Sequence, residues 1–561
     1  MSLTAFSDQR ALFKAYDIRG ERALFTAQFT AALSDALARQ FVHHANVSQV
    51  VIGFDARHYS ETLAKQMASS FQAYGFEVIW LGLVTTPLMA FWANQYQGHG
   101  VIATASHSEP HINGIKWLIN SQSPSSEQIQ EVYQQLFDYS SDTERIADKN
   151  SAKVNSKPGT ALPNPTPQQT LLPQKDILNL YINKAVEAIT RINQSRLKAT
   201  LPACQPNIEP ETSAFKIVID CLNGSTGLFA EAFYTAHPCL CSEVILLNAN
   251  TDGDFPKGNP DPMEYNRLHE LSAAVVNHKA DLGLSFDGDG DRLMVVDSSG
   301  QPLVADHLLY LLSRVAIEDH FESAACNDSD AGSPTVIFDV KCSHHLPTLI
   351  QQAGAQAQMS KTGSSILRRA LQAKKDGTES HILFAGELSG HFIFNDGYFL
   401  LHDDAMYAGL RLLNWLNHQP STLAEIIDTL PEMVSTPDVY LPLADYSYSV
   451  SQDTTLSEDQ QSSQPILDKL SALCQKLQSN IKDLPVSLPS DARLTCIDGL
   501  RLDFSNGFGI IRSSNTSNSL TVRFAGDSLS DLTQIQGYFV SLCQSISPDL
   551  ASQVANIQVN Q

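Results

Sequence analysis

Short, continuously apolar segments recur along the chain, and each leads into a stretch with helical spacing. Three of them end in an aspartate that enters a polar turn: Val50 to Asp55, Phe215 to Asp220 and Thr335 to Asp339. Continuous apolar runs of this kind are typical of parallel strands that are buried on both faces of a sheet. Because helical spacing follows each turn, the repeat predicts three related α/β domains with mixed sheets.

Helical spacing is clearest in three segments of the first half. A helix is predicted from about 27 to 44 and another over 124–138, where Ser125 and Gln128 could form a capping box. The helical pattern resumes at Ile177. The 124–138 helix is expected to pack into a core rather than to bind a partner helix.

The last part of the chain has a different pattern. Leu494 to Phe504, Gly507 to Ile511 and Leu520 to Phe524 are predicted strands, and a helix is predicted from about Asp531 to Ile546. Strands that follow one another before a helix favour an antiparallel sheet with helices. We therefore expect a separate C-terminal α+β domain that starts near residue 431.

Polar, proline-containing stretches separate these units. Residues 139–170 are predicted to be a linker or disordered insertion, and 322–334 and 449–465 are similar polar insertions. Three prolines in 252–264 exclude regular helix there and predict a rigid loop. The resulting division is 1–138 (domain I), 139–172 (linker), 173–305 (domain II), 306–430 (domain III) and 431–561 (domain IV).

Composition narrows the choice of partners and compartment. The formal net charge of −23 argues against a nucleic-acid surface and against attraction to anionic lipid. Nine cysteines lack paired CxxC spacing and are expected to be free thiols in a reducing cytoplasm. The chain has neither the roughly 18 apolar residues of a membrane span nor a signal-peptide pattern. We expect a cytoplasmic monomer or weak homo-oligomer without nucleic-acid or membrane partners.

The polar loop over Thr104–Lys116 follows a short apolar strand, Val101 to Ala103. Junctions of this kind are where α/β proteins place their chemistry. Ser106 is the candidate reactive hydroxyl, His107 could handle protons and Lys116 could hold a phosphate. A plain polar turn would have the same composition, so this motif alone does not decide the function.

Three alternating carboxylates, Asp287, Asp289 and Asp291, follow the apolar strand Leu282 to Phe286. Such a group repels itself unless a cation offsets the charge, and hard oxygen ligands favour Mg²⁺. Either an extended strand or a loop could bring the three carboxylates together, and a solvated acidic turn is the plain alternative. An EF-hand is excluded, because its sixth and twelfth positions would hold Arg292 and Ser298.

Two further loops carry groups suited to a phosphorylated sugar. Glu387, Ser389 and His391 lie in a glycine-bounded loop, and their polar groups suit two adjacent sugar hydroxyls. The second loop offers a guanidinium fork and small donors that could surround a phosphate. Its residues are Arg512, Ser514, Asn515 and Thr516. A surface turn is the alternative for both loops.

Together with Tyr16-Asp17-Ile18-Arg19-Gly20, these motifs resemble the α-D-phosphohexomutase superfamily, and most closely its bacterial phosphomannomutase/phosphoglucomutase members. They occur in the family's order from residue 13 to about 526. The resemblance implies four domains, three α/β and one α+β, around a central cleft. It also implies that Ser106 is carried as phosphoserine and holds Mg²⁺ together with the three aspartates.

The implied reaction moves phosphate between O6 and O1 of mannose or glucose through a 1,6-bisphosphate, which turns round in the cleft. Glucose 1,6-bisphosphate or an equivalent hexose bisphosphate would act as activator. Arg19, His107 and Lys116 are the implied catalytic partners of Ser106. The implied substrate-binding residues are Tyr16, Arg292, Lys341, Glu387, Ser389, His391, Arg512, Ser514, Asn515 and Thr516.

Three positions depart from the family pattern. Ser108-Glu109-Pro110 stands where Asn-Pro is usual, Thr516-Ser517-Asn518 lacks the usual acid and proline, and Ser364 replaces a histidine. Leu388 and Gly290 favour a phosphomannomutase/phosphoglucomutase over a phosphoglucosamine mutase.

Two other functions stay open from sequence. A metal-dependent phosphatase would release the phosphoryl group to water. A non-catalytic relative would bind sugar phosphate without turnover. A serine hydrolase is disfavoured, because the chain has no GxSxG elbow and the acidic trio would have no role in that mechanism.

Overall fold

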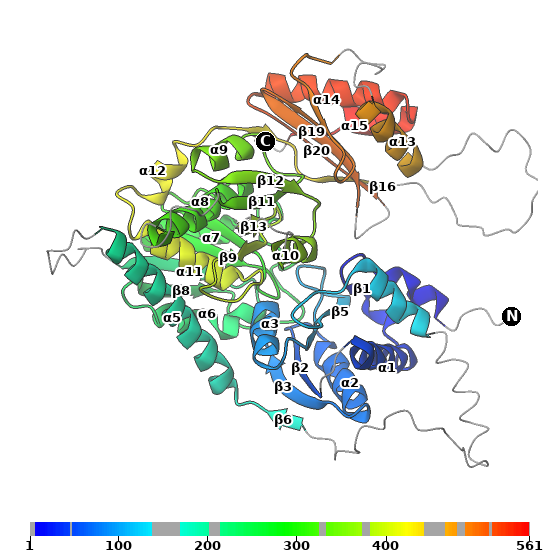
Figure 1. Cartoon of the computed structure of the whole chain (residues 1–561), viewed down its shortest axis with the longest axis vertical. Helices are drawn as coiled ribbons and strands as arrows, with labels where there is room; N and C mark the ends of the chain where they lie inside the picture. Colours follow the sequence, from blue (N-terminus) through cyan, green and yellow to red (C-terminus); the bar gives the residue numbers. More distant parts are fainter. Residues whose placement is uncertain are drawn as a thin grey trace, which may run out of the picture. The chain divides into compact units, whose positions relative to one another are not determined.

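The computed structural model describes residues 6–44, 48–136, 169–200, 214–324, 333–372, 382–442, 466–479, 488–514 and 519–559 (Figure 1). The chain forms two compact units. The first comprises Met1–Val336 and Gly363–Asp428, and the second comprises Ile337–Thr362 and Thr429–Gln561. No helix among the described residues is long and apolar enough to cross a membrane.

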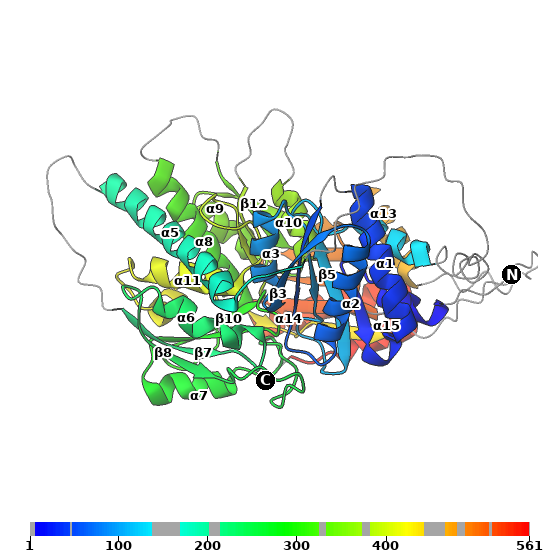
Figure 2. The ribbon, with the colours of Figure 1, turned by 90° about the horizontal axis from the view of Figure 1, so that it is seen from below.

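The first sheet has the strand order β1-β5-β4-β2-β3-β6. Helices α1 and α2 lie on one side of it and α3 lies on the other (Figures 1 and 2). The central strand β2 pairs parallel with β3 and β4, whereas β5 pairs antiparallel with β4 and β1, so the sheet is mixed. Its elements are β1 (Ile18–Glu21), α1 (Ala27–His44), β2 (Gln49–Phe54), α2 (Ser60–Ala73), β3 (Glu77–Leu83), α3 (Thr86–Gln95), β4 (Gly100–Ala103), β5 (Ile112–Leu118) and β6 (Gln169–Leu171).

The second sheet has the order β10-β9-β7-β8 and is also mixed. Strand β7 is parallel to β8 and β9, and β9 forms an antiparallel hairpin with β10. Its strands and flanking helices are β7 (Phe215–Asp220), α6 (Ala230–Thr235), β8 (Cys241–Leu247), α7 (His269–His278), β9 (Leu282–Phe286) and β10 (Leu293–Asp297). The β9–β10 turn holds the predicted acidic trio.

The aspartates that end the predicted strands organise the turns that follow. The Asp55 carboxylate accepts the Arg57 backbone N–H at 3.1 Å, and Asp220 accepts that of Leu222 at 3.0 Å. Each bond spans two residues and closes an Asx turn. The equal geometry at β2 and β7 gives the repeated sequence pattern a physical cause, because both strands must turn sharply into the next element.

The rest of the first unit is mainly helical. It comprises α5 (Gln174–Thr200), α8 (Ala305–Ala324), α10 (Ser364–Gln372), the antiparallel pair β13 (Ile382–Gly386) and β14 (Phe392–Phe394), α11 (Ala405–Leu416) and α12 (Leu423–Ile427). Arg411, on α11, is fully buried and pairs with Asp396 at 2.6 Å and Asp319 at 2.7 Å. Losing one partner of such a buried pair is expected to destabilise the unit strongly, because a charge would be left uncompensated.

The second unit is built on an antiparallel sheet of order β15-β20-β19-β18-β17, with β16 also pairing with β20. Helices α14 and α15 lie together beside this sheet (Figure 1). Its elements are β11 (Thr335–Asp339), α9 (Leu346–Gln352), β12 (Gln356–Ser360), β15 (Val434–Ser435), β16 (Val439–Pro442), α13 (Ile466–Ser479), β17 (Arg493–Thr495), β18 (Leu500–Phe504), β19 (Gly507–Ser513), β20 (Ser519–Gly526), α14 (Leu529–Gln544) and α15 (Pro548–Ala555). The unit begins within β11, at Ile337.

The segment that follows β11 is attached to this C-terminal sheet by buried arginines. Arg501 donates to the carbonyl oxygens of Val340 at 2.5 Å and Cys342 at 2.7 Å. Arg523 donates to that of Lys341 at 2.5 Å. Because three successive carbonyls are held from the sheet, the turn after β11 has a defined conformation.

Most predicted elements are present, with three differences in extent. The 124–138 helix spans 126–136 in the described residues, and Ser125 and Gln128 form the predicted capping box with bonds of 2.8 and 3.3 Å. The strand predicted at 494–504 is two strands, β17 and β18. Helix α8 continues to Ala324, into the predicted insertion at 322–334. The 449–465 insertion and 139–168 of the linker lie outside the described residues.

Candidate active site

The Ser106 loop joins β4 to β5 and is held in a constrained shape. Ser106 is buried and has a φ of 54°, in the left-handed region that non-glycine residues rarely adopt. Its N–H donates to the Thr104 hydroxyl at 2.9 Å. The Arg57 guanidinium donates to the carbonyl oxygens of Ser106, Ser108 and Glu109 at 2.6, 2.5 and 2.7 Å. These bonds fix the direction of the Ser106 side chain.

The acidic residues converge through a tight turn rather than along a strand. Gly290, at a φ of 77°, reverses the chain between β9 and β10. One carboxylate oxygen of Asp287 accepts three backbone N–H groups, from Gly290, Asp291 and Arg292, at 3.0 to 3.1 Å. The other accepts the Ser106 hydroxyl at 2.7 Å. The reactive hydroxyl and the acidic turn are therefore in direct contact.

A glycine permits this contact. A side chain at Gly288 would place its Cβ 2.5 Å from the Ser106 carbonyl oxygen, so the two loops approach closely only without one. The proline-containing loop predicted at 252–264 supports the turn from the other side. It forms turns without regular helix, and its Pro260 carbonyl accepts the Gly288 N–H at 3.0 Å.

Lys116, on β5, reaches the other two aspartates. Its Nζ lies 2.8 Å from Asp289 Oδ2 and 2.7 Å from Asp291 Oδ2. Asp289 Oδ2 also accepts the Thr86 hydroxyl at 2.5 Å and the Thr104 hydroxyl at 3.2 Å. Burial opposes the charge of Lys116, but the two carboxylates outweigh it and raise the lysine pKa. Lys116 is therefore a cation at neutral pH and not a ready proton acceptor.

The trio fits a divalent cation. Asp287, Asp289 and Asp291 are all buried, and each offers a carboxylate oxygen within 4.8 Å of the others. Oδ1 of Asp289 is buried and has no hydrogen-bond partner among the described residues. Burial, together with the charges of Asp291 and Asp289, raises the pKa of Asp287 well above its usual range. A bound cation would oppose that shift, since it favours the ionised carboxylate.

His107 lies between the serine and an arginine, and this fixes its tautomer. Its Nε2 is 3.3 Å from the Arg292 guanidinium, and its Nδ1 is 3.1 Å from Ser106 Oγ. Burial and the Arg292 and Arg19 charges hold the pKa of His107 well below its usual range. Because arginine can only donate, Nε2 accepts and Nδ1 carries the proton. In this arrangement His107 donates to Ser106, while the serine proton points to Asp287.

The predicted Arg19 and Tyr16 also lie in the first unit. Arg19 donates through Nη2 to Asp17 at 2.5 Å and through Nη1 to the Ser108 hydroxyl at 3.2 Å. Ser108 begins one of the three departures from the family pattern, and here it is a partner of Arg19. The Tyr16 ring packs against Gly363, just before Ser364 at the start of α10.

The Glu387 loop is tied to the acidic turn by His391. The His391 imidazole lies 3.0 Å from Glu387 Oε2 and 3.3 Å from Asp291 Oδ1, and 2.9 Å from the Ser389 hydroxyl. Burial would lower the pKa of His391, but the Asp291 and Glu387 carboxylates raise it to about 10. His391 therefore joins two loops through its positive charge, a role that sequence reasoning did not anticipate.

This charge yields a prediction for metal-depleted protein. The pKa of His391 is near 6.5 in the unfolded protein and about 10 in the folded protein. Protonation of His391 therefore contributes its full free energy to stability at any pH below about 6.5. This contribution to the free energy of unfolding falls as the pH rises from about 6.5 to the folded-state pKa of about 10, by up to about 1.4 kcal/mol per pH unit. We expect His391→Gln to flatten the fall of unfolding free energy between pH 7 and 10, measured with denaturant. Parallel curves for the two proteins would contradict the assignment.

The remaining predicted residues belong to the second unit. Lys341 pairs with Asp438 at 2.5 Å, and Arg512 Nε donates to Asp498 at 2.7 Å. Nη2 of Arg512 is buried without a hydrogen-bond partner among the described residues, so it has a donor to spare. The Ser514 N–H donates to Ser519 at 2.9 Å. Asn515 and Thr516, like the departures at 517 and 518, lie outside the described residues.

Sequence reasoning missed several residues that shape the site. Arg57, Thr86 and Thr104 had no assigned role. Asp403 was not considered, although it pairs with Arg368 and lies 4.0 Å from His391. Only the strand–Asp–x–Arg pattern at Asp55 could have indicated Arg57. The other contacts join positions far apart in the chain and leave no local pattern.

Comparison with known proteins agrees with this architecture. Sequence models of the three phosphoglucomutase/phosphomannomutase alpha/beta/alpha domains match residues 10–143, 196–300 and 305–434. A phosphomannomutase/phosphoglucomutase of Pseudomonas syringae is 30% identical, with 96% of each chain covered. A phosphoglucomutase of Neisseria meningitidis is 31% identical, with 96% of this chain and 98% of the relative covered.

A solved structure of a phosphoglucomutase/phosphomannomutase family protein from Burkholderia thailandensis is also similar. It has 26% identity and a TM-score of 0.72, and the match covers 99% of this chain and 100% of that one. The predicted three mixed α/β domains are thereby confirmed. With matches of this length and identity, the chain belongs to the phosphoglucomutase/phosphomannomutase family.

Proposed function

We propose that the chain interconverts hexose 6-phosphate and hexose 1-phosphate through a phosphoserine at Ser106 and a hexose 1,6-bisphosphate. The observation that carries the proposal is the hydrogen bond of 2.7 Å from the Ser106 hydroxyl to Asp287. Asp287 belongs to a buried group of three carboxylates, and Lys116 forms ion pairs with the other two, Asp289 and Asp291. A lone serine is a weak nucleophile and leaving group and needs charge stabilisation around it. Family membership supplies the reaction class.

In each half-reaction the bond between phosphorus and one oxygen breaks while a bond to another oxygen forms. From phospho-Ser106, the phosphoryl group passes to the free hydroxyl of the sugar phosphate. The bond from phosphorus to the serine oxygen breaks, the sugar hydroxyl loses its proton and the serine oxygen gains one, so the two oxygens exchange a proton for the phosphoryl group. The bisphosphate then presents its other phosphoryl group, and Ser106 takes it back. Lys116 is charged and lies beside the trio, so it would stabilise the transferring phosphoryl oxygens. His107, neutral and bonded to Arg292, would orient Ser106.

We assign Mg²⁺ to the acidic trio, with Ser106 as a further ligand through its phosphoryl group. The donors are carboxylate oxygens, which Mg²⁺ prefers over nitrogen ligands, and the buried Asp289 Oδ1 is available. A cation here would offset the charge that develops on the serine oxygen as the phosphoryl group leaves. Glucose 1,6-bisphosphate, or an equivalent hexose bisphosphate, would phosphorylate Ser106 in protein that has lost its phosphate.

The sugar is expected to be mannose or glucose. The Pseudomonas relative is named for both activities and the Neisseria relative for phosphoglucomutase alone. Glu387 and Ser389 would contact the sugar hydroxyls, with the Glu387 carboxylate held in place by Ser389 and His391. Tyr16, Arg19 and Arg292 from the first unit and Lys341, Arg512, Ser514, Asn515 and Thr516 from the second complete the proposed substrate-binding set.

We further propose that the chain divides into domains at 1–138, 173–305, 306–430 and 431–561, with a linker at 139–172. The protein would be a cytoplasmic monomer or weak homo-oligomer that acts on hexose phosphates and not on nucleic acid. The cysteines among the described residues are free, which suits a reducing compartment.

The deciding experiment compares kcat/KM for mannose 1-phosphate, glucose 1-phosphate and N-acetylglucosamine 1-phosphate with Mg²⁺ and glucose 1,6-bisphosphate. Formation of hexose 6-phosphate from mannose or glucose 1-phosphate, without free phosphate, is the expected result. Preference for the N-acetylated sugar would indicate a phosphoglucosamine mutase. Free phosphate without hexose 6-phosphate would indicate a phosphatase, and binding without turnover would indicate a non-catalytic relative.

Arg512→Ala tests the proposed grip on the phosphate that is not being transferred. Losing a charged, bidentate contact typically costs about 2–3 kcal/mol, which is on the order of 30- to 150-fold in kcat/KM. Because the sugar reverses between half-reactions, the loss should be similar in both directions. Phospho-Ser106 should still form at high glucose 1,6-bisphosphate. The exposed Arg493, on β17 of the same sheet, is the matched control as Arg493→Ala. Unchanged kinetics in both directions, with the protein folded, would rule out this loop as the phosphate grip.

A further inference from the structure

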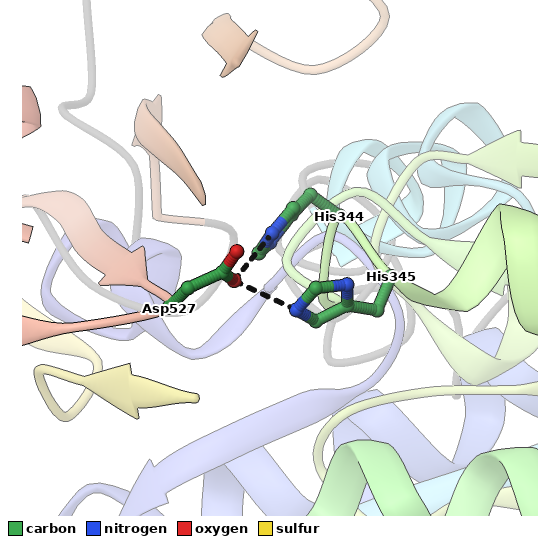
Figure 3. Close-up of side chains that lie close together, drawn as sticks. All are labelled: His344, His345 and Asp527. Atoms are coloured by element: carbon green, nitrogen blue, oxygen red, sulfur yellow. Dashed lines mark hydrogen bonds and ion pairs between the residues drawn. The ribbon is translucent and has the colours of Figure 1, made fainter. Parts of the chain in front are cut away.

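A second group of metal-ligating side chains lies in the C-terminal unit, made by His344, His345 and Asp527 (Figure 3). The two histidines follow β11 and directly precede α9, and the aspartate lies between β20 and α14. All three belong to the second unit, whereas the Asp287 trio belongs to the first. No residue of this cluster was singled out by the sequence patterns.

The donor atoms converge on one point. Nε2 of His344 lies 3.0 Å, and Nε2 of His345 2.8 Å, from the same oxygen of Asp527, and Figure 3 shows both rings turned toward it. In a tetrahedral zinc site, metal–ligand distances of about 2.0–2.2 Å separate the donors by roughly 3.3–3.4 Å. Each imidazole nitrogen therefore needs to move away from the Asp527 oxygen by only about half an ångström to admit an ion.

The backbone already holds the ligands in place. The His345 N–H donates to the Ser343 hydroxyl at 3.1 Å, and the Asp527 N–H donates to the Asn506 carbonyl at 3.0 Å. The same turn is held by Arg501 through the Val340 and Cys342 carbonyls. Little conformational freedom would be lost when an ion binds, which favours binding.

The local charges also suit a cation. No lysine or arginine in the described part of the chain pairs with Asp527, so the two imidazoles are its only ion-pair partners there. Two imidazoles and one carboxylate form a donor set typical of zinc and similar transition metals, not of Mg²⁺.

We propose that His344, His345 and Asp527 form a second metal site, for a divalent transition cation of the Zn²⁺, Co²⁺ or Ni²⁺ class. The ion would join the turn after β11 to the loop between β20 and α14. This site is independent of the proposed mutase reaction and of the Asp287 trio, because it uses different ligands and prefers a different class of metal.

Moderate affinity is expected. Metal-binding histidines usually donate their far ring nitrogen to a carboxylate or carbonyl, which orients the ring and strengthens the ligand. Nδ1 of His344 is buried and has no such partner among the described residues. Binding through Nε2 would leave a buried N–H unpaired, so we expect a dissociation constant nearer micromolar than nanomolar.

The test is a titration of chelator-treated, full-length protein with Co²⁺ in saturating Mg²⁺, so that the acidic trio is occupied. We expect one Co²⁺ per chain, with a visible absorption band from a site of low coordination number, and displacement of Co²⁺ by Zn²⁺. His345→Ala and Asp527→Asn should each weaken binding by at least about tenfold. Both side chains are partly exposed, so the variants should fold, and their unfolding without metal is compared with wild type.

The control is His58→Ala. His58, Asp252 and Asp254 form another, more exposed cluster of potential ligands. This variant should titrate like wild type. No Co²⁺ or Zn²⁺ uptake in Mg²⁺, equal affinity in His345→Ala, or loss of binding in His58→Ala would each overturn the proposal.

Discussion

Ser106→Ala is expected to leave the fold intact and to lower turnover by at least about a hundredfold, because the covalent carrier of the phosphoryl group is lost. The structure limits the other consequences of this change. Among the described residues the Ser106 hydroxyl is bonded to Asp287 and His107 only, and both keep their remaining partners. The positive φ of Ser106 is held by Arg57 and Thr104, which do not depend on the side chain.

Intact-mass analysis supplies the matching measurement. Wild-type protein treated with glucose 1,6-bisphosphate should carry one phosphate, and Ser106→Ala should carry none. Ser108→Ala is the control on the same loop and should keep the phosphate, because the Ser108 hydroxyl contacts Arg19 rather than the acidic trio. A folded Ser106→Ala protein with near-wild-type turnover would disprove the phosphoserine assignment.

Asp289→Asn is expected to weaken Mg²⁺ binding by at least about tenfold and to lower turnover in parallel. Asp289 Oδ2 accepts from Thr86, Thr104 and Lys116, whereas Oδ1 has no partner among the described residues. An asparagine must turn its oxygen toward those three donors. Its NH₂ group would then occupy the place of Oδ1 and point its protons at the cation.

Calorimetric Mg²⁺ titration, read beside the Mg²⁺ dependence of turnover, separates metal binding from folding. Asp254→Asn provides the same chemical change at an exposed carboxylate and should leave both curves unchanged. If Asp289→Asn titrates with Mg²⁺ as wild type does and turns over at the same rate, the trio is not the metal site.

Most of the strands, turns and helix caps that could be predicted follow from short, local sequence patterns. An apolar strand followed by a polar, glycine-containing turn identified the positions of Ser106, Asp287 and Glu387, because strand and turn are both set within a few residues. The same holds for the capping box at Ser125 and Gln128. The division of the predicted 494–504 strand into β17 and β18 was not predicted, because an apolar segment does not show where the backbone stops pairing with a neighbouring strand.

What the sequence alone determined was the chemical inventory and its order: strand-end aspartates, a serine loop, an acidic turn and helical spacing between them. Tertiary structure decided how these groups act on one another. Lys116 meets Asp289 and Asp291 across more than 170 positions of chain, and the resulting charge depends on burial. The pairing of His344 and His345 with Asp527 arises in the same way. Distance and solvent exposure set such contacts, and neither quantity is encoded in any short segment.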